Sequence, residues 1–219
     1  MKNNERTELV FILDRSGSMS GLEADTIGGY NSMLQRQREQ EGEVTVTTVL
    51  FDDRYELLHD RVPLTDLVPI TEKDYYVRGC TALLDAIGTT IGKIDSAQRH
   101  ILPEKRAGKV LFVITTDGME NASRRFRYED IRALVDRHRE QGWEFLFLGA
   151  NIDAISVAGR MGISEDRAVE YHADSQGTLL NFRAVGEAIS HIRTPKSAPL
   201  SAGWKAPIEA DRKNRKRSR

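Results

Sequence analysis

The sequence predicts an α/β fold: a doubly wound, mostly parallel sheet of six strands, with helices on both faces and one antiparallel edge strand. Three observations predict it. Six short apolar runs rich in β-branched residues recur along the chain. Segments of helical period separate most of these runs, and parallel strands need such crossovers. One pair of runs is joined by too few residues for a helix.

The predicted strands share short length and apolar composition. They are Glu8–Leu13, Val44–Phe51, Tyr55–Leu64, Lys109–Thr115, Trp143–Gly149 and Arg167–His172. The first holds five consecutive apolar residues, which is typical of a strand buried on both faces. Between the second and third, only Asp52, Asp53 and Arg54 separate the runs, and we attribute the two acids to a tight reversal. This hairpin predicts the antiparallel edge strand.

The predicted helices show apolar residues three and four positions apart. They are Leu22–Glu41, Ala82–Ile101, Tyr128–Glu140, Ala154–Met161 and Leu179–Ile192. In the second, Leu84, Ile87 and Ile91 fall on one face. Such a face predicts packing against the sheet.

Composition is that of a water-soluble globular chain. The 219 residues are 39% hydrophobic and 30% charged, and Cys80 is the single cysteine, so no intrachain disulfide can form. The first apolar run is too short for a signal-peptide core or a membrane span. We therefore expect a cytoplasmic protein.

The regular patterns stop after Arg193. The remaining segment holds three prolines and a basic cluster: residues 211–219 contain six Lys or Arg and one acid, whereas the rest of the chain has 26 basic and 32 acidic residues. We expect an extended or disordered tail. Nucleic acid is a possible but less favoured partner for it, and a solubilising role is the alternative. Trp204 is unusual there and would dock on the body or on a partner.

Oxygen-bearing side chains follow two predicted strands and begin one helix. Asp14, Ser16 and Ser18 follow the first strand, Asp117 follows the fourth, and Thr81 starts the second helix. Ligands of doubly wound sheets bind outside the carboxyl ends of the strands, where strand order reverses. If the first and fourth strands are neighbours, these five oxygen donors converge. They suit a hard divalent cation, and we expect Mg²⁺ or Mn²⁺ rather than Ca²⁺.

A simpler interpretation exists for the first of these motifs. Asp–x–Ser–x–Ser by itself also fits a helix N-terminus, where such side chains accept hydrogen bonds from free amide groups. Because Thr81 and Asp117 accompany it, we favour the metal site.

Three motifs resemble the metal-ion-dependent adhesion site (MIDAS) of von Willebrand factor type A domains: Asp14–Arg15–Ser16–Gly17–Ser18, the lone Thr81, and Thr116–Asp117–Gly118. The similarity in element order covers Glu8 to Ile192, so we expect a type A domain over residues 1–193 and the tail over 194–219. The resemblance implies a Rossmann-like sheet of six strands and a Mg²⁺ held by the five oxygen-bearing residues above. It also implies that a partner's acidic side chain completes the metal shell.

Five arginines fall in the three loops expected around the metal, although the body is net acidic. They are Arg15, Arg78, Arg124, Arg125 and Arg127. Guanidinium groups there would steer and bind acidic partners. The alternative is that they are ordinary solvated loop residues.

These features favour a metal-dependent protein-protein interaction module, such as an adaptor, and we expect no enzymatic activity. The alternative is a phosphoryl- or ester-transfer enzyme with the same metal as Lewis acid and Asp14 or Ser16 as nucleophile. The chain has no nucleophile elbow, P-loop or zinc-protease motif, and none of its five histidines lies in a motif loop.

Overall fold

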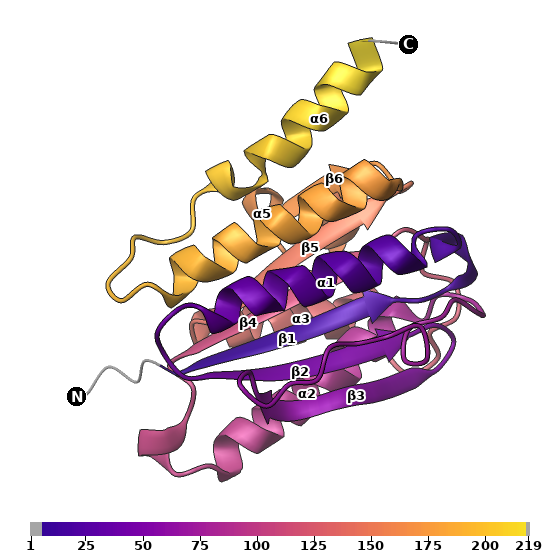
Figure 1. Ribbon diagram of the computed structural model, residues 1–219. Helices are drawn as coiled ribbons and strands as arrows, with labels where there is room; N and C mark the ends of the chain where they lie inside the picture. The colour runs from indigo at the N-terminus through magenta and orange to yellow at the C-terminus, as the bar shows by residue number, and fades with distance from the viewer. Residues whose placement is uncertain (1–5, 218–219) are drawn as a thin grey trace.

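Six strands form one sheet in the order β3-β2-β1-β4-β5-β6. The computed structural model describes residues 6–217, and the side chains of 216 and 217 are not described (Figure 1). The strands are β1 (Thr7–Asp14), β2 (Val44–Phe51), β3 (Tyr55–Pro63), β4 (Lys109–Thr116), β5 (Glu144–Ala150) and β6 (Ala168–Tyr171). All neighbours are parallel except β2 and β3. The predicted antiparallel edge strand is confirmed.

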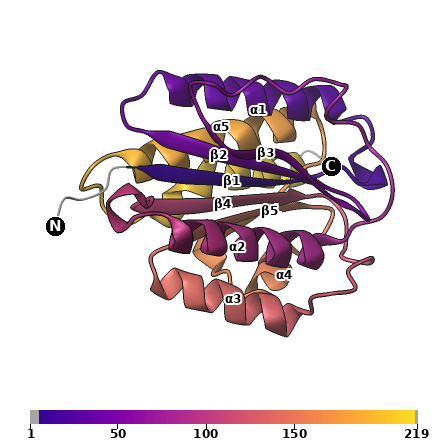
Figure 2. The ribbon, with the colours of Figure 1, turned by 90° about the horizontal axis from the view of Figure 1, so that it is seen from below.

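Helices cover both faces of the sheet, as predicted (Figure 2). The helices α1 (Glu23–Arg38) and α5 (Ser175–Arg193) lie on one face, and α2 (Leu83–His100), α3 (Tyr128–Glu140) and α4 (Ala154–Arg160) on the other. Short 3-10 helices occur at Gly17–Met19, Pro103–Lys105, Glu165–Arg167 and Ala202–Lys205. No helix among residues 6–217 is long and apolar enough to cross a membrane.

The core consists of two apolar layers separated by the sheet. Alternate side chains of β1 enter opposite layers. Leu9 and Phe11 pack under α1 and α5, whereas Val10 and Ile12 pack against α2 and α3. All four side chains are fully buried. The continuous apolar run of β1 therefore follows from burial on both faces.

The point where strand order reverses lies between β1 and β4. β1 pairs with β2 on one side and with β4 on the other, both in parallel. The carboxyl ends of β1 and β4 are therefore adjacent, and Asp14 and Asp117 leave the sheet side by side. This is the crevice in which doubly wound folds bind ligands.

The C-terminal segment corrects one expectation. We expected an extended or disordered tail over residues 194–219, but Ala206–Arg217 forms helix α6, which packs on β6 and α5 (Figure 1). Trp204 anchors the segment to the body: its Nε1–H donates to the Asp166 carbonyl at 2.8 Å, and its ring is buried. The expectation failed because the buried Trp204 ring holds this segment against the body. Residues 218 and 219 of the expected tail lie outside the described residues.

Candidate metal centre

The carboxylate of Asp14 is fixed between β1 and β4. It lies at the end of β1 and is completely buried. Its Oδ1 accepts a hydrogen bond from the Ser16 amide at 2.7 Å, and its Oδ2 accepts one from the Thr116 hydroxyl at 2.6 Å. The orientation of this carboxylate is therefore set by the protein itself.

Three hydroxyl groups from two loops surround one small space beside Gly118. The hydroxyl oxygens of Ser16 and Ser18 are 3.0 Å apart. A Cβ atom at Gly118 would lie 3.0 Å from Ser18 Oγ, 3.0 Å from Thr81 Oγ1 and 3.8 Å from Ser16 Oγ. The structure thus brings together the hydroxyls that the sequence motifs selected.

Asp117 completes the group from the end of β4. The Ser18 hydroxyl donates to its Oδ1 at 2.5 Å, whereas its Oδ2 is buried and has no hydrogen-bond partner among the described residues. A buried carboxylate oxygen without a partner is costly. A bound cation would remove that cost.

Burial makes both carboxylates reluctant to ionise. It raises the pKa of Asp14 to about 6, and the hydrogen bonds from Thr116 and Ser16 only partly oppose this effect. Burial also raises the pKa of Asp117. Both shifts are those expected where a positive charge would stabilise the ionised forms.

Two residues that the sequence analysis did not select hold Thr81 and Asp14 in place. The side-chain Oδ1 of Asn121 accepts a hydrogen bond from the backbone amide of Thr81 at 3.0 Å. The backbone amide of Asn121 donates to the Thr81 carbonyl, also at 3.0 Å. The Tyr75 hydroxyl donates to the Asp14 carbonyl at 2.5 Å. The only available signal was the position of Asn121, four residues after Asp117; nothing in the sequence marked Tyr75.

Arg15 does not belong to the predicted partner-binding surface. Its side chain is completely buried and donates to Asp52 Oδ2 at 3.1 Å and to Glu56 Oε2 at 2.6 Å. Arg78 donates to the same Asp52 oxygen at 2.6 Å. Burial alone would raise the pKa of Asp52, but the two arginines and the Arg54 amide hold it below its usual value. Sequence position placed Arg15 in the loop without revealing that it points inward.

The remaining arginines do reach solvent. Arg124, Arg125 and Arg127 are exposed. Their loop is held against the start of α2, because Asp85 accepts hydrogen bonds from the Arg124 and Arg125 amides, each at 2.9 Å. These three residues remain candidates for contacting a partner, whereas Arg78 is already engaged by Asp52.

Comparison with known proteins shows the fold. No family model matches the chain, and no curated protein matches it. Among solved structures, the vWF domain of the type V pili tip protein Mfa5 from Porphyromonas gingivalis superposes with a TM-score of 0.58 and 12% identity, covering 89% of this chain and 98% of that one. This chain has the von Willebrand factor type A fold.

Other structures of the same fold are longer. Proximal thread matrix protein 1 from the mussel byssus, in a structure with a zinc-occupied MIDAS motif, matches with a TM-score of 0.56 and 15% identity over 84% of this chain and 46% of that one. The von Willebrand factor type A protein from Catenulispora acidiphila matches with a TM-score of 0.55 and 13% identity, covering 86% of this chain and 43% of that one. This chain therefore spans less than half the length of these two proteins.

The residues at the carboxyl ends of β1 and β4 fit a divalent cation. The donor set consists of hydroxyl and carboxylate oxygens, and only two carboxylates contribute. Within residues 6–217 no three or more His, Cys, Asp and Glu side chains cluster in a way that could hold a metal, so any binding here depends on the serine and threonine hydroxyls. Such a set is typical of hard cations that keep some coordination positions for water or a partner.

Proposed function

We propose that this chain binds a partner protein through a divalent cation, Mg²⁺ or Mn²⁺, held by Asp14, Ser16, Ser18, Thr81 and Asp117. The observation that carries the proposal is the buried Asp117 Oδ2 without a hydrogen-bond partner, next to three converging hydroxyl groups. When bound, the metal would supply an electrophile with an open coordination position. An acidic side chain of the partner would occupy that position.

Few carboxylates and many neutral donors support this kind of recognition. Two carboxylates do not exceed the charge of a divalent ion, and with only one of them bound directly the metal would keep net positive charge for a partner's carboxylate. The exposed Arg124, Arg125 and Arg127 would add attraction for an acidic partner surface. The single cysteine supports placing this interaction in the cytoplasm.

We also propose that the chain is not an enzyme. Phosphoryl or ester transfer with Ser16 as the nucleophile would need a base near its hydroxyl. That hydroxyl is hydrogen-bonded to Ser18, and no histidine bonds to Ser16, Ser18 or Thr81 in the described part of the chain. Mg²⁺-dependent turnover in a phosphatase and esterase screen, lost in Asp14→Asn, would reverse this conclusion.

A nucleic-acid function for the basic C-terminus is less favoured. Arg212 forms an ion pair with Glu170, and Arg215 pairs with Asp174 and Asp211. These cations of α6 hold the helix to the body. Retention on a heparin column tests whether the basic C-terminus binds polyanions. We expect removal of residues 211–219 to leave the retention unchanged.

The metal step is tested by substituting Gly118 by alanine. The added Cβ would crowd Ser18 Oγ and Thr81 Oγ1, so Mg²⁺ and Mn²⁺ affinity measured by calorimetry should fall roughly 10- to 100-fold. Gly92→Ala is the matched control, because Gly92 is exposed on α2 and a Cβ there meets nothing within 4 Å. Unchanged affinity in Gly118→Ala would contradict the site.

The partner step is tested by capture from a lysate in Mg²⁺ or in EDTA, followed by mass spectrometry. Proteins retained by wild type and by Gly92→Ala in Mg²⁺, but released by EDTA and absent with Gly118→Ala, would be the partners. A partner retained equally in EDTA and by Gly118→Ala would show that recognition does not use the metal.

A further inference from the structure

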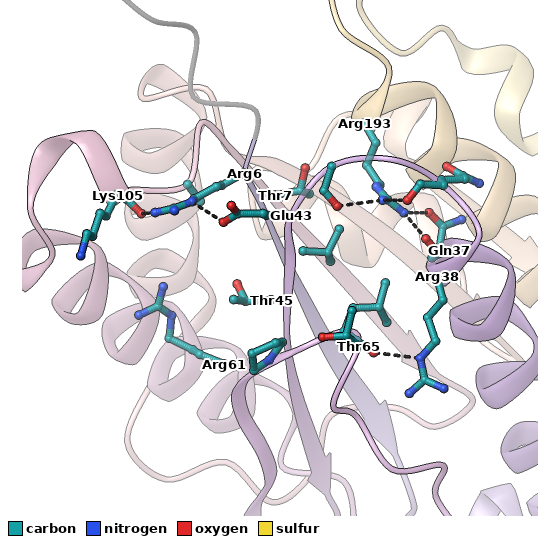
Figure 3. Close-up of a pocket in the computed structure, with 16 residues that line it drawn as sticks. Arg6, Thr7, Gln37, Arg38, Glu43, Thr45, Arg61, Thr65, Lys105 and Arg193 are labelled. Atoms are coloured by element: carbon teal, nitrogen blue, oxygen red, sulfur yellow. Dashed lines mark hydrogen bonds and ion pairs between the residues drawn. The ribbon is translucent and has the colours of Figure 1, made fainter.

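A cavity lies at the opposite end of the sheet from the candidate metal centre. It has a volume of about 490 Å³ and opens where β1 and β2 begin, β3 ends and the helices α1 and α5 finish (Figure 3). This volume lies within the roughly 300–1,000 Å³ range of small-molecule sites. Nothing in the metal chemistry above uses this cavity.

The cavity combines an apolar base with cationic walls. Val44, Pro63, Leu64 and Ala107 supply apolar surface. Five cationic side chains and one carboxylate, Glu43, complete the lining; the cations are Arg6, Arg38, Arg61, Lys105 and Arg193. Figure 3 shows Arg6 and Arg61 on opposite sides of the space, with Thr45 between them. Such an excess of positive charge is unusual on a chain whose net charge is −1.

Carboxylates neutralise only part of this charge. Arg6 pairs with Glu43 at 2.6 Å, and Arg61 pairs at 2.9 Å with Glu8, a buried residue of β1. No carboxylate lies within ion-pair distance of Lys105 in the described chain. The pocket thus keeps a positive potential after its internal pairs are formed.

Arg193 adds charge that neutral groups alone hold in place. Its guanidinium donates to the carbonyls of Gln37 at 2.7 Å and Glu41 at 2.9 Å, at the end of α1. Burial lowers its pKa. These acceptors occupy both terminal nitrogens of the guanidinium, so Arg193 adds positive charge beside the cavity rather than free hydrogen-bond donors.

We propose that this cavity binds a small organic anion that carries an apolar group, such as an alkyl phosphate or carboxylate. The anionic end would interact with the cationic walls, which keep a net positive charge, and the apolar part would cover Val44 and Leu64. Inorganic phosphate alone leaves the apolar surface exposed, and a neutral amphiphile leaves the positive charge uncompensated. Both should therefore bind more weakly.

Octyl phosphate is a suitable probe, used below its micelle-forming concentration in calorimetry with the whole chain. We expect saturable binding of one octyl phosphate, tighter than that of octanol, octylammonium or inorganic phosphate. Tighter binding of octanol would mean a purely apolar site, and equal binding of inorganic phosphate would mean a simple anion site. Either result, or no octyl phosphate binding, would overturn the proposal.

The location is tested with charge changes at two exposed residues of the rim. Lys105→Glu combined with Thr65→Glu should weaken octyl phosphate binding about tenfold or more. Lys213→Glu on α6 is the matched control, and Asp117→Ala should also bind normally because the metal centre is at the other end. Equal binding by the rim variant, with an unchanged circular dichroism spectrum, would refute this cavity as the site.

Discussion

At the scale of single residues, the candidate metal centre places a carboxylate where water is excluded. Asp14 is completely buried, and its two oxygens already accept hydrogen bonds from Ser16 and Thr116. These bonds fix its direction but do not offset the loss of solvation, because its pKa remains raised. The site is therefore arranged for a cation at some cost to the metal-free fold.

That cost predicts a pH dependence of stability. The folded pKa of Asp14, about 6, exceeds the ordinary value of 3.8, so the folded state binds the proton more tightly. In metal-free buffer, this residue's contribution to the free energy of unfolding should fall by about 3 kcal/mol as pH rises from 4 to above 6. Asp14→Asn should lack that component, and the difference between the two proteins in urea titrations measures it.

Bound metal should raise the free energy of unfolding of the wild type at neutral pH. At pH 7.5, Mg²⁺ should stabilise the wild type, because it binds the folded and not the unfolded chain, and should stabilise Asp14→Asn much less. Parallel pH profiles for the two metal-free proteins would show that burial of Asp14 carries no such cost.

Arg15 shows the limit of prediction at this scale. Its neighbours in sequence, Asp14 and Ser16, come together with the other oxygen donors as the motif predicted. Arg15 turns the other way and pairs with Asp52 and Glu56, both from the hairpin. The partners of a charged side chain depend on which distant segments surround it, and a motif does not contain that information.

At the scale of secondary structure elements, side-chain periodicity predicted which segments are helices and which are strands, whereas capping residues decided where the helices begin. β2 and α3 begin and end at the predicted residues. α5 begins at Ser175, four residues earlier than predicted, because Asp174 caps it by accepting a hydrogen bond from the Gly177 amide at 2.8 Å. The apolar stripe indicates where a helix faces the core, whereas the polar cap indicates where it starts.

Helix α6 depends on its anchor rather than on its own sequence. Most residues of α6 are polar or charged. The buried residues that attach the segment to the α1 and α5 layer are Leu200, Trp204 and Ile208. The adjacent Lys205 is also buried, and its Nζ donates to the Glu165 and Ala168 carbonyls at 2.7 and 3.0 Å. An isolated helix of this length is marginal in water, so packing stabilises it.

Trp204→Ala should therefore destabilise the protein. Loss of the buried ring and of the hydrogen bond to the Asp166 carbonyl should lower the free energy of unfolding by about 3–5 kcal/mol, measured in urea. Lys213→Ala, at an exposed position of α6, should change it by less than about 0.5 kcal/mol. Equal stability of the two variants would mean that the segment docks without contributing to the core.

At the scale of the whole molecule, one sheet supports two apolar layers and two chemically distinct ends. The carboxyl ends of β1 and β4 carry the candidate metal centre, and the amino ends of β1 and β2 border the cationic cavity. Both layers share the same strands, since alternate side chains of each strand enter opposite layers. Neither layer can therefore lose its packing while the other keeps its own.

The two tryptophans report on the two layers separately. Trp143 lies in the layer under α2 and α3, and Trp204 in the layer under α1 and α5. In Trp143→Phe and in Trp204→Phe, the urea midpoint from the remaining tryptophan's fluorescence should coincide with the midpoint from far-ultraviolet circular dichroism. An earlier fluorescence transition in Trp143→Phe would show that the Trp204 segment detaches before the sheet unfolds.

The sequence by itself determined the alternation of strands and helices, the hairpin at Asp52 and Asp53, and the oxygen donors at the strand ends. These are local features: side-chain periodicity and turn chemistry act within a few residues, so they can be read along the chain. The tertiary structure alone decided that Arg15 is buried, that Trp204 docks a helix, and that cations from five segments line one cavity. Each of these depends on contacts between residues far apart in sequence, whose free energies arise only when the sheet brings the segments together.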